Sequence, residues 1–87
     1  PYNSLTREQL ATILYRYAKW SGRSTYAPTD ALAGFADAAE VSAYALDAMR
    51  WAVYTGLMQG SENGLEPQSS ASRAQVAAII HRFLDNK

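Results

Sequence analysis

Two arginines stand at matching places in the chain and are its most distinctive candidates for chemistry. Arg7 and Arg73 each follow a residue that can cap a helix, so each falls in the first turn of a predicted helix. The helix dipole disfavours positive charge at that end. A structural explanation is a salt bridge or a snorkelling contact, and a functional one is capture of a carboxylate by the guanidinium and free helix N–H groups. The residue pattern leaves both explanations open.

The remaining polar residues assemble no catalytic or metal site. His81 is the single histidine, and a catalytic or metal role would need partners that the sequence does not place around it. Asp30, Asp37, Glu40 and Asp47 match no calcium-binding loop and are better explained as helix caps and surface charges. There is no cysteine. We therefore expect a binding or structural protein, not an enzyme, with no metal and no cofactor.

The elements that must position the arginines are a repeated segment. Residues 1–17 and 67–83 align with an offset of 66 residues and share seven identical positions, namely Pro1/Pro67, Ser4/Ser70, Arg7/Arg73, Gln9/Gln75, Ala11/Ala77, Ile13/Ile79 and Arg16/Arg82. Repeats of this size usually bury their apolar faces against neighbouring copies. The chain therefore resembles part of an array, which begins inside one copy and continues through the next.

Composition limits the classes of partner. The 87 residues suffice for one small domain, and 48% of them are hydrophobic, which argues against disorder. Eight basic and eight acidic residues cancel, so we expect no nucleic-acid partner. No apolar run approaches the roughly 20 residues that span a bilayer, so we expect no membrane insertion.

Periodicity and capping signals predict a small all-α fold with two equivalent long helices and a middle helix. Thr6 with Gln9, and Ser72 with Gln75, form capping boxes that begin helices near 6–20 and 72–84. The middle helix is expected from about Ser42 to a C-cap at Gly56, with Asp37 and Glu40 before it or in its first turn. The connector 21–34 has room for a short helical turn at Ala31 and Leu32. We expect the two long helices to pack on the middle helix through matching stripes: Leu10, Ile13, Leu14 and Tyr17, and Val76, Ile79, Ile80 and Phe83.

Trp51 lies beside the main apolar stripe of the middle helix, so it is either a core residue or a contact residue. Partly exposed indoles stack on sugar rings as readily as they fill cores.

The ordered set of motifs resembles the bacterial S-layer homology repeat. It comprises Phe35-x-Asp37, Val41-Ser42-x-Tyr44-Ala45, Trp51-Ala52-Val53, Gly56-Leu57-Met58-Gln59-Gly60, Asn63-Gly64-Leu65-x-Pro67 and Ser72-Arg73-Ala74-Gln75. The resemblance implies three units: 1–22 as the closing helix of a preceding repeat, 23–33 as a connector, and 34–87 as a complete repeat. It also implies that the chain is part of a pseudo-threefold helical spindle.

The resemblance further implies non-covalent anchoring of an exported protein to the bacterial cell wall, and therefore an extracellular location. The partners would be secondary cell-wall polysaccharide, often pyruvylated, and further repeats in the same chain or another copy. By position, Arg73, Arg7 and Trp51 would bind ligand, with Gln59 and Gly60 lining the groove.

Two departures from the family pattern leave an alternative open. The motif glutamate is replaced by Gln9 and Gln75, and the chain holds about one and a half repeats where three are usual. The alternative is a degenerate packing or self-association module that binds no glycan.

Overall fold

The computed structural model describes residues 5–60 and 64–85. Their secondary structure consists of α1 (Arg7–Trp20), the 3₁₀ turns η2 (Ala38–Glu40) and η3 (Ala43–Ala45), α2 (Leu46–Tyr54) and α3 (Arg73–Asp85). Isolated β-bridges occur between Thr6 and Ser70 and at Gly64, and none of the described residues forms a strand. The predicted all-α fold is therefore confirmed.

Local capping chemistry sets the start of both long helices. The Thr6 hydroxyl accepts from the Gln9 backbone N–H at 3.2 Å, and the Gln9 side chain accepts from the Thr6 N–H at 2.8 Å. Ser72 and Gln75 form the same reciprocal pair at 3.1 and 3.0 Å. Both predicted capping boxes are confirmed, and α1 ends just before Gly22, which takes a φ of +84°.

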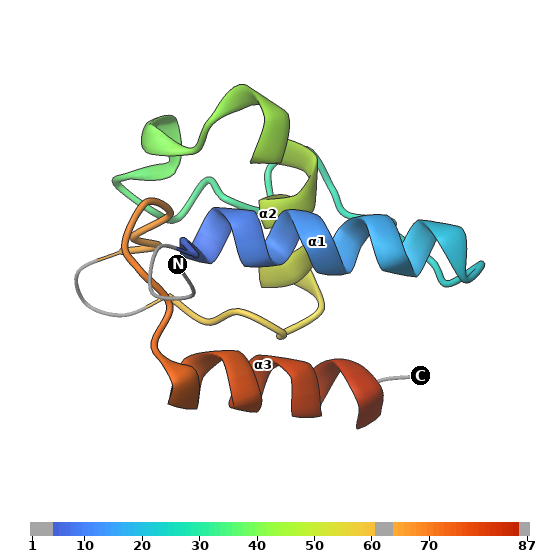
Figure 1. Cartoon of the computed structure of the whole chain (residues 1–87). Coiled ribbons are helices and arrows are strands. Elements are labelled where there is room, and N and C mark those ends of the chain that lie inside the picture. Colours follow the sequence, from blue (N-terminus) through green and yellow to red (C-terminus); the bar gives the residue numbers. More distant parts are fainter. Residues whose placement is uncertain (1–4, 61–63, 86–87) are drawn as a thin grey trace.

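The long helices α1 and α3 run in roughly the same direction, with the chain that follows α2 passing between them (Figure 1). Hydrogen bonds join this segment to both helices: the Arg7 guanidinium donates to the Gln59 carbonyl, and Arg82 donates to the Leu57 carbonyl. Helix α2 crosses behind α1 and packs directly against it. Residues 57–59 are therefore held between two helices.

The two equivalent helices bury different faces, so the expected packing through matching stripes is wrong. Ile79 and Phe83 are the buried residues of α3. Their counterparts in α1, Ile13 and Tyr17, are 53% and 50% exposed. The core face of α1 is formed by other apolar residues, namely Leu10, Ala11, Leu14 and Ala18. A helix face is buried only where another segment packs on it. Helix α1 packs against α2 and η3, whereas Phe83 of α3 packs against Trp51.

The middle of the chain is less helical than predicted. The segment from Ser42 first forms the 3₁₀ turn η3 and becomes α-helical only at Leu46. Asp37 and Glu40 therefore lie before α2 and not in its first turn. The Ala31–Leu32 segment forms hydrogen-bonded turns without a helix, although Leu32 is buried in the core.

Two pairs of motif residues shape the loops after α2. A methyl group added to Gly60 would overlap the ring of Phe35, so the side chain of residue 60 must be absent. Both oxygens of the Asp37 carboxylate accept backbone N–H groups, from Leu65 and Glu66, each at 2.9 Å. Asp37 thus holds the loop around residue 65 by hydrogen bonds and does not interact with the N-terminal dipole of α2. Of the motif and repeat residues, Asn63, Pro1 and Ser4 lie outside the described residues.

Across the described residues, no helix is long and apolar enough to cross a membrane.

Candidate functional site

Arg7 is buried at the start of α1, with 9% of its surface exposed, and reaches into the following loops. Its Nε donates to the Leu65 carbonyl at 2.9 Å, and its Nη2 donates to the Gln59 carbonyl at 3.1 Å. These bonds explain how a cation is tolerated in the first turn, since two carbonyl dipoles face it. Neither a salt bridge nor a snorkelling contact is involved among the described residues.

The backbone N–H groups of the first turn of α1 are also occupied. The Arg7 N–H donates to the Ser69 carbonyl at 3.0 Å, and the Glu8 N–H donates to the Pro67 carbonyl at 2.9 Å. Residues 67–69 lead into α3, so the chain entering one long helix caps the start of the other. Free N–H groups, which the anion-capture hypothesis invoked beside the guanidinium, are therefore not offered at these two positions.

Arg7 and Gln59 meet in a groove of about 170 Å³ between α1, α3 and the loop after α2. The residues that line it are Arg7, Met58, Gln59, Gln75, Ala78, Ile79 and Arg82. Two arginines and two glutamines contribute its polar side chains, and no acidic residue is among them. Such a set of donors suits an anionic group, and a carboxylate in particular can accept paired bonds from a guanidinium. We call this the arginine groove.

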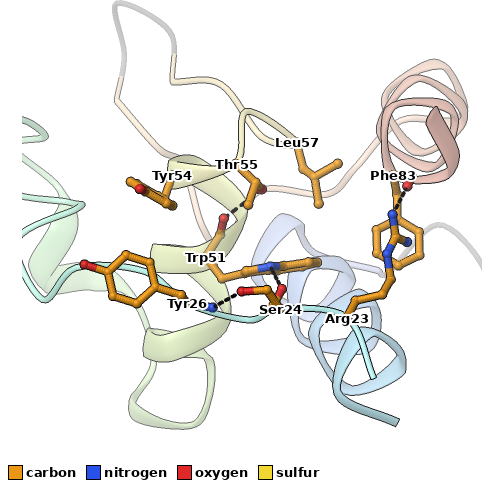
Figure 2. A pocket seen from close by; sticks show the side chains of 8 residues that line it. All are labelled: Arg23, Ser24, Tyr26, Trp51, Tyr54, Thr55, Leu57 and Phe83. Atoms are coloured by element: carbon orange, nitrogen blue, oxygen red, sulfur yellow. Dashed lines mark hydrogen bonds between the residues drawn. The ribbon is translucent and has the colours of Figure 1, made fainter. Parts of the chain in front are cut away.

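Trp51 lies elsewhere, in an aromatic cleft of about 290 Å³ shown in Figure 2. The indole is 3% exposed, and its Nε1 donates to the Ser24 carbonyl at 3.2 Å. Its ring makes edge-on contacts with Tyr15 of α1 and Phe83 of α3, at centroid distances of 5.7 and 6.1 Å. Trp51 therefore joins two helices and the connector, which supports the core interpretation of this residue.

The rest of the aromatic cleft comes largely from the connector and the end of α2. The Arg23 guanidinium stacks 4.0 Å over the Phe83 ring, and its Nη2 donates to the Phe83 carbonyl at 2.8 Å. Tyr26 and Tyr54 meet edge to face at 5.6 Å and are both more than half exposed. The connector thus covers the core beside α3 rather than merely linking two units.

The two other predicted site residues occupy separate places. Arg73 is exposed at the start of α3 and, within the described residues, forms no hydrogen bond or ion pair. It borders a shallow apolar groove with Leu5, Ala71, Val76 and Ala77. Gly60 is exposed beside the Phe35 ring and does not line the arginine groove. The structure therefore brings Arg7 and Gln59 together and leaves Trp51, Arg73 and Gly60 apart from them.

Glu8 is a buried polar residue that sequence reasoning missed. Its carboxylate accepts from the Ser42 N–H at 2.9 Å, the Ser42 hydroxyl at 2.6 Å and the Tyr44 hydroxyl at 3.3 Å. Desolvation, followed by the neighbouring Glu8 charge and the hydrogen bond to Glu8, raises the pKa of Tyr44, although most of its side chain is exposed. Glu8 corresponds to Ala74 in the second copy, and this difference within a repeated segment is the signal that marks it.

Arg82 was also missed as a candidate site residue. Its Nη1 donates to the Leu57 carbonyl at 3.2 Å, which places the side chain along the edge of the arginine groove. The sequence signal was available, since Arg82 is one of the identical repeat positions and corresponds to Arg16. His81, by contrast, is a surface residue as expected, and its ring lies 3.2 Å from the Asp85 carboxylate.

Comparison with known proteins assigns the family. The S-layer homology domain matches residues 34–77, which is half of the chain, and the chain belongs to this family. No curated protein and no solved structure matches the chain. Domains of this family are binding modules that anchor proteins to the cell wall, so membership indicates a protein of the cell surface or cell wall.

Proposed function

We propose that this module binds secondary cell-wall polysaccharide non-covalently and that the arginine groove takes an acidic group of that glycan. The observation that carries the proposal is the pair of arginines, Arg7 and Arg82, in one groove whose lining contains no carboxylate. A pyruvate ketal on a wall sugar supplies a carboxylate of the required charge.

Each groove residue has a distinct proposed role. Arg7 is held by two carbonyls through Nε and Nη2, so its Nη1 remains for the ligand. Arg82 adds the second charge from α3. The amides of Gln59 and Gln75 can donate to or accept from sugar hydroxyls. The groove is smaller than the roughly 300–1,000 Å³ of pockets that enclose drug-sized ligands, so it suits a terminal acidic group and leaves the polymer outside.

Trp51, Gly60 and Arg73 have indirect roles in this proposal. Trp51 supports the segment that carries Gln59 by packing between α1 and α3. Gly60 lets that segment approach Phe35. Arg73 lies apart from the arginine groove. It would act in an equivalent groove only beside a loop that offers it carbonyls, as Gln59 and Leu65 do for Arg7, and residues 5–60 and 64–85 place no such loop there.

The decisive experiment is a calorimetric titration with purified wall polysaccharide, with and without its pyruvate. Arg82→Gln should weaken binding of the pyruvylated glycan about tenfold or more, because it removes one charge-assisted contact. Arg16→Gln is the matched control, since Arg16 is the repeat counterpart of Arg82. Arg16 is exposed on α1 and lines neither the arginine groove nor the aromatic cleft. Removing pyruvate should weaken binding by the intact chain and leave Arg82→Gln little changed.

The competing function is the degenerate packing module. It predicts no heat of binding with either glycan, and equal behaviour of Arg82→Gln and Arg16→Gln. Equal affinity for both forms of the glycan would retain carbohydrate binding but refute the role of the arginine groove.

A further inference from the structure

We propose that the glycan runs from the arginine groove along α3 to the aromatic cleft, where Tyr26 and Tyr54 bind one of its neutral sugars. The inference rests on the proposed glycan binding and deepens it, because it states which kind of sugar each hollow takes. It also gives a binding role to two tyrosines that lie outside the family motifs.

A third hollow joins the two sites. It has a volume of about 340 Å³ and is lined by Thr55, Gly56, Leu57, Arg82 and Asp85. We call it the Gly56 hollow. Thr55 and Leu57 also line the aromatic cleft, and Arg82 also lines the arginine groove. The three hollows therefore adjoin one another between α3 and the segment that follows α2.

Two features keep the Gly56 hollow open and hold a charge at its edge. Gly56 has a φ of +84°, which side chains rarely adopt, and a Cβ added there would meet no atom within 4 Å. The Arg82 guanidinium is held by its hydrogen bond to the Leu57 carbonyl. Arg82 therefore stands between the Gly56 hollow and the arginine groove, within reach of a ligand in either.

The far end of the aromatic cleft offers exposed aromatic rings. Tyr26 and Tyr54 are 64% and 55% exposed, and their rings meet at 83°, edge to face. In such a pair one ring gives only its edge, so both of its faces stay clear of the partner. Figure 2 shows the two tyrosines on the other side of Trp51 from Phe83. A ring that is apolar on its face and polar at its hydroxyl suits a sugar ring, which has the same dual character.

The charges of the three hollows differ, and this difference sorts the sugars. The arginine groove has Arg7 and Arg82 and no carboxylate in its lining. The Gly56 hollow sets Asp85 against Arg82. A carboxylate there disfavours a second acidic group but can accept hydrogen bonds from sugar hydroxyls. The ligand that fits is therefore a glycan in which an acidic sugar is followed by neutral ones.

The sizes of the hollows favour a polymer that occupies them in turn. The arginine groove, the Gly56 hollow and the aromatic cleft have volumes of about 170, 340 and 290 Å³. Pockets that enclose drug-sized ligands begin at roughly 300 Å³, so none of the three would enclose an oligosaccharide by itself. Successive sugars would each take one hollow.

The test is calorimetry with two probes: purified pyruvylated wall polysaccharide, with affinity expressed per repeating unit, and the methyl glycoside of a single pyruvylated hexose. The original chain should bind the polysaccharide more tightly, because only the polymer reaches the aromatic cleft. Tyr54→Ala should weaken binding of the polysaccharide about two- to tenfold and leave binding of the single sugar unchanged. Tyr54→Phe keeps the ring and should bind both probes as the original chain does.

Two further variants serve as controls. Arg82→Gln should weaken binding of both probes, because the acidic sugar is common to them. Trp20→Ala should change neither, since Trp20 is an aromatic residue that is 81% exposed on α1 and lines none of the three hollows.

Full affinity of Tyr54→Ala for the polysaccharide, together with a loss in Arg82→Gln, would overturn this inference and leave the role of the arginine groove intact. An equal loss of both probes in Tyr54→Ala would also overturn it, because the tyrosine would then act on the fold and not on a neutral sugar. If the original chain bound neither probe, the proposed function would fail as well.

Discussion

Two buried or half-buried carboxylates hold the irregular middle of the chain to the regular helices. Glu8 of α1 receives three hydrogen bonds from Ser42 and Tyr44, at the start of η3. Asp37 receives two backbone N–H groups from the loop around residue 65. At the scale of single residues, these two carboxylates hold in place the segments 35–45 and 64–71, which contain no α-helix.

Removing the charge of Glu8 should destabilise the fold. In Glu8→Gln an amide N–H₂ group faces donors that now bond to a carboxylate, so the free energy of unfolding should fall by about 1–3 kcal/mol. Urea denaturation followed by circular dichroism measures the change. Glu40→Gln is the control, because Glu40 is exposed, and it should stay within about 0.5 kcal/mol of the original chain. Equal effects of the two substitutions would contradict this role.

Asp37 should make stability depend on acid pH. The N–H groups of Leu65 and Glu66 lower the pKa of Asp37 below its ordinary value of 3.8. A carboxyl with a lowered pKa in the folded state stabilises the fold above its unfolded pKa. That contribution is lost as pH falls from about 3.8 through the folded pKa.

The measurement is a set of denaturation curves between pH 6 and pH 2, which starts above the ordinary pKa of an aspartate and extends below it. Asp37→Asn should lower stability at pH 6 and flatten the loss of stability toward acid pH. Parallel pH profiles for the variant and the original chain would show that Asp37 does not contribute in this way.

At the scale of elements, the same helix sequence serves two different packing roles. Helix α1 turns Leu10, Leu14 and Ala18 toward α2 and the loops, while α3 turns Ile79 and Phe83 toward the core. Each helix has apolar residues on more than one face, so each can contact more than one neighbouring element. In the structure α1 and α3 bury different apolar faces.

Isoleucines at matching repeat positions allow this to be tested with a single substitution type. Ile79→Ala should lower the free energy of unfolding by about 2–5 kcal/mol, because a buried side chain leaves a cavity. Ile13→Ala should change it by about 0.5 kcal/mol or less, because Ile13 is largely exposed. Chemical denaturation of both variants decides. Similar losses would mean that the two helices bury the same face after all.

At the scale of the whole molecule, the chain is compact but has uncovered apolar surface. Its radius of gyration is 11.9 Å, close to the roughly 12 Å expected for a folded domain of this length. Yet several large apolar side chains are exposed on its long helices: Ile13, Tyr17, Trp20, Ile80 and Leu84. Both long helices thus carry apolar surface that the described residues leave exposed.

We expect the isolated chain to associate as its concentration rises, through apolar surface on α3. Leu84→Glu should shift association to concentrations at least about tenfold higher, because it places a charge on that surface. Sedimentation velocity or light scattering over a concentration series measures the shift. Ala39→Glu is a useful comparison, since Ala39 is exposed in η2 and not on α3, and it should shift association less. A monomer at every concentration would show that the exposed faces do not self-associate.

The sequence by itself determined the local structure of this protein. Capping boxes at Thr6 and Ser72, apolar periodicity and the glycines that end helices act over a few residues, so they specify the all-α fold and both long helices. The ordered motifs likewise identified the family. These features depend on neighbours along the chain, which the sequence lists directly.

Only the tertiary structure decided which copy of each repeated residue is buried and what it contacts. Arg7 and Arg73 have the same local sequence, yet one holds two loop carbonyls and the other lies exposed. The placement of Trp51 in a cleft apart from Arg7, and of Arg7 and Arg82 in one groove, likewise depends on segments far along the chain. The physical reason is that burial is set by neighbours in space, and two related segments far apart along the chain need not receive the same neighbours.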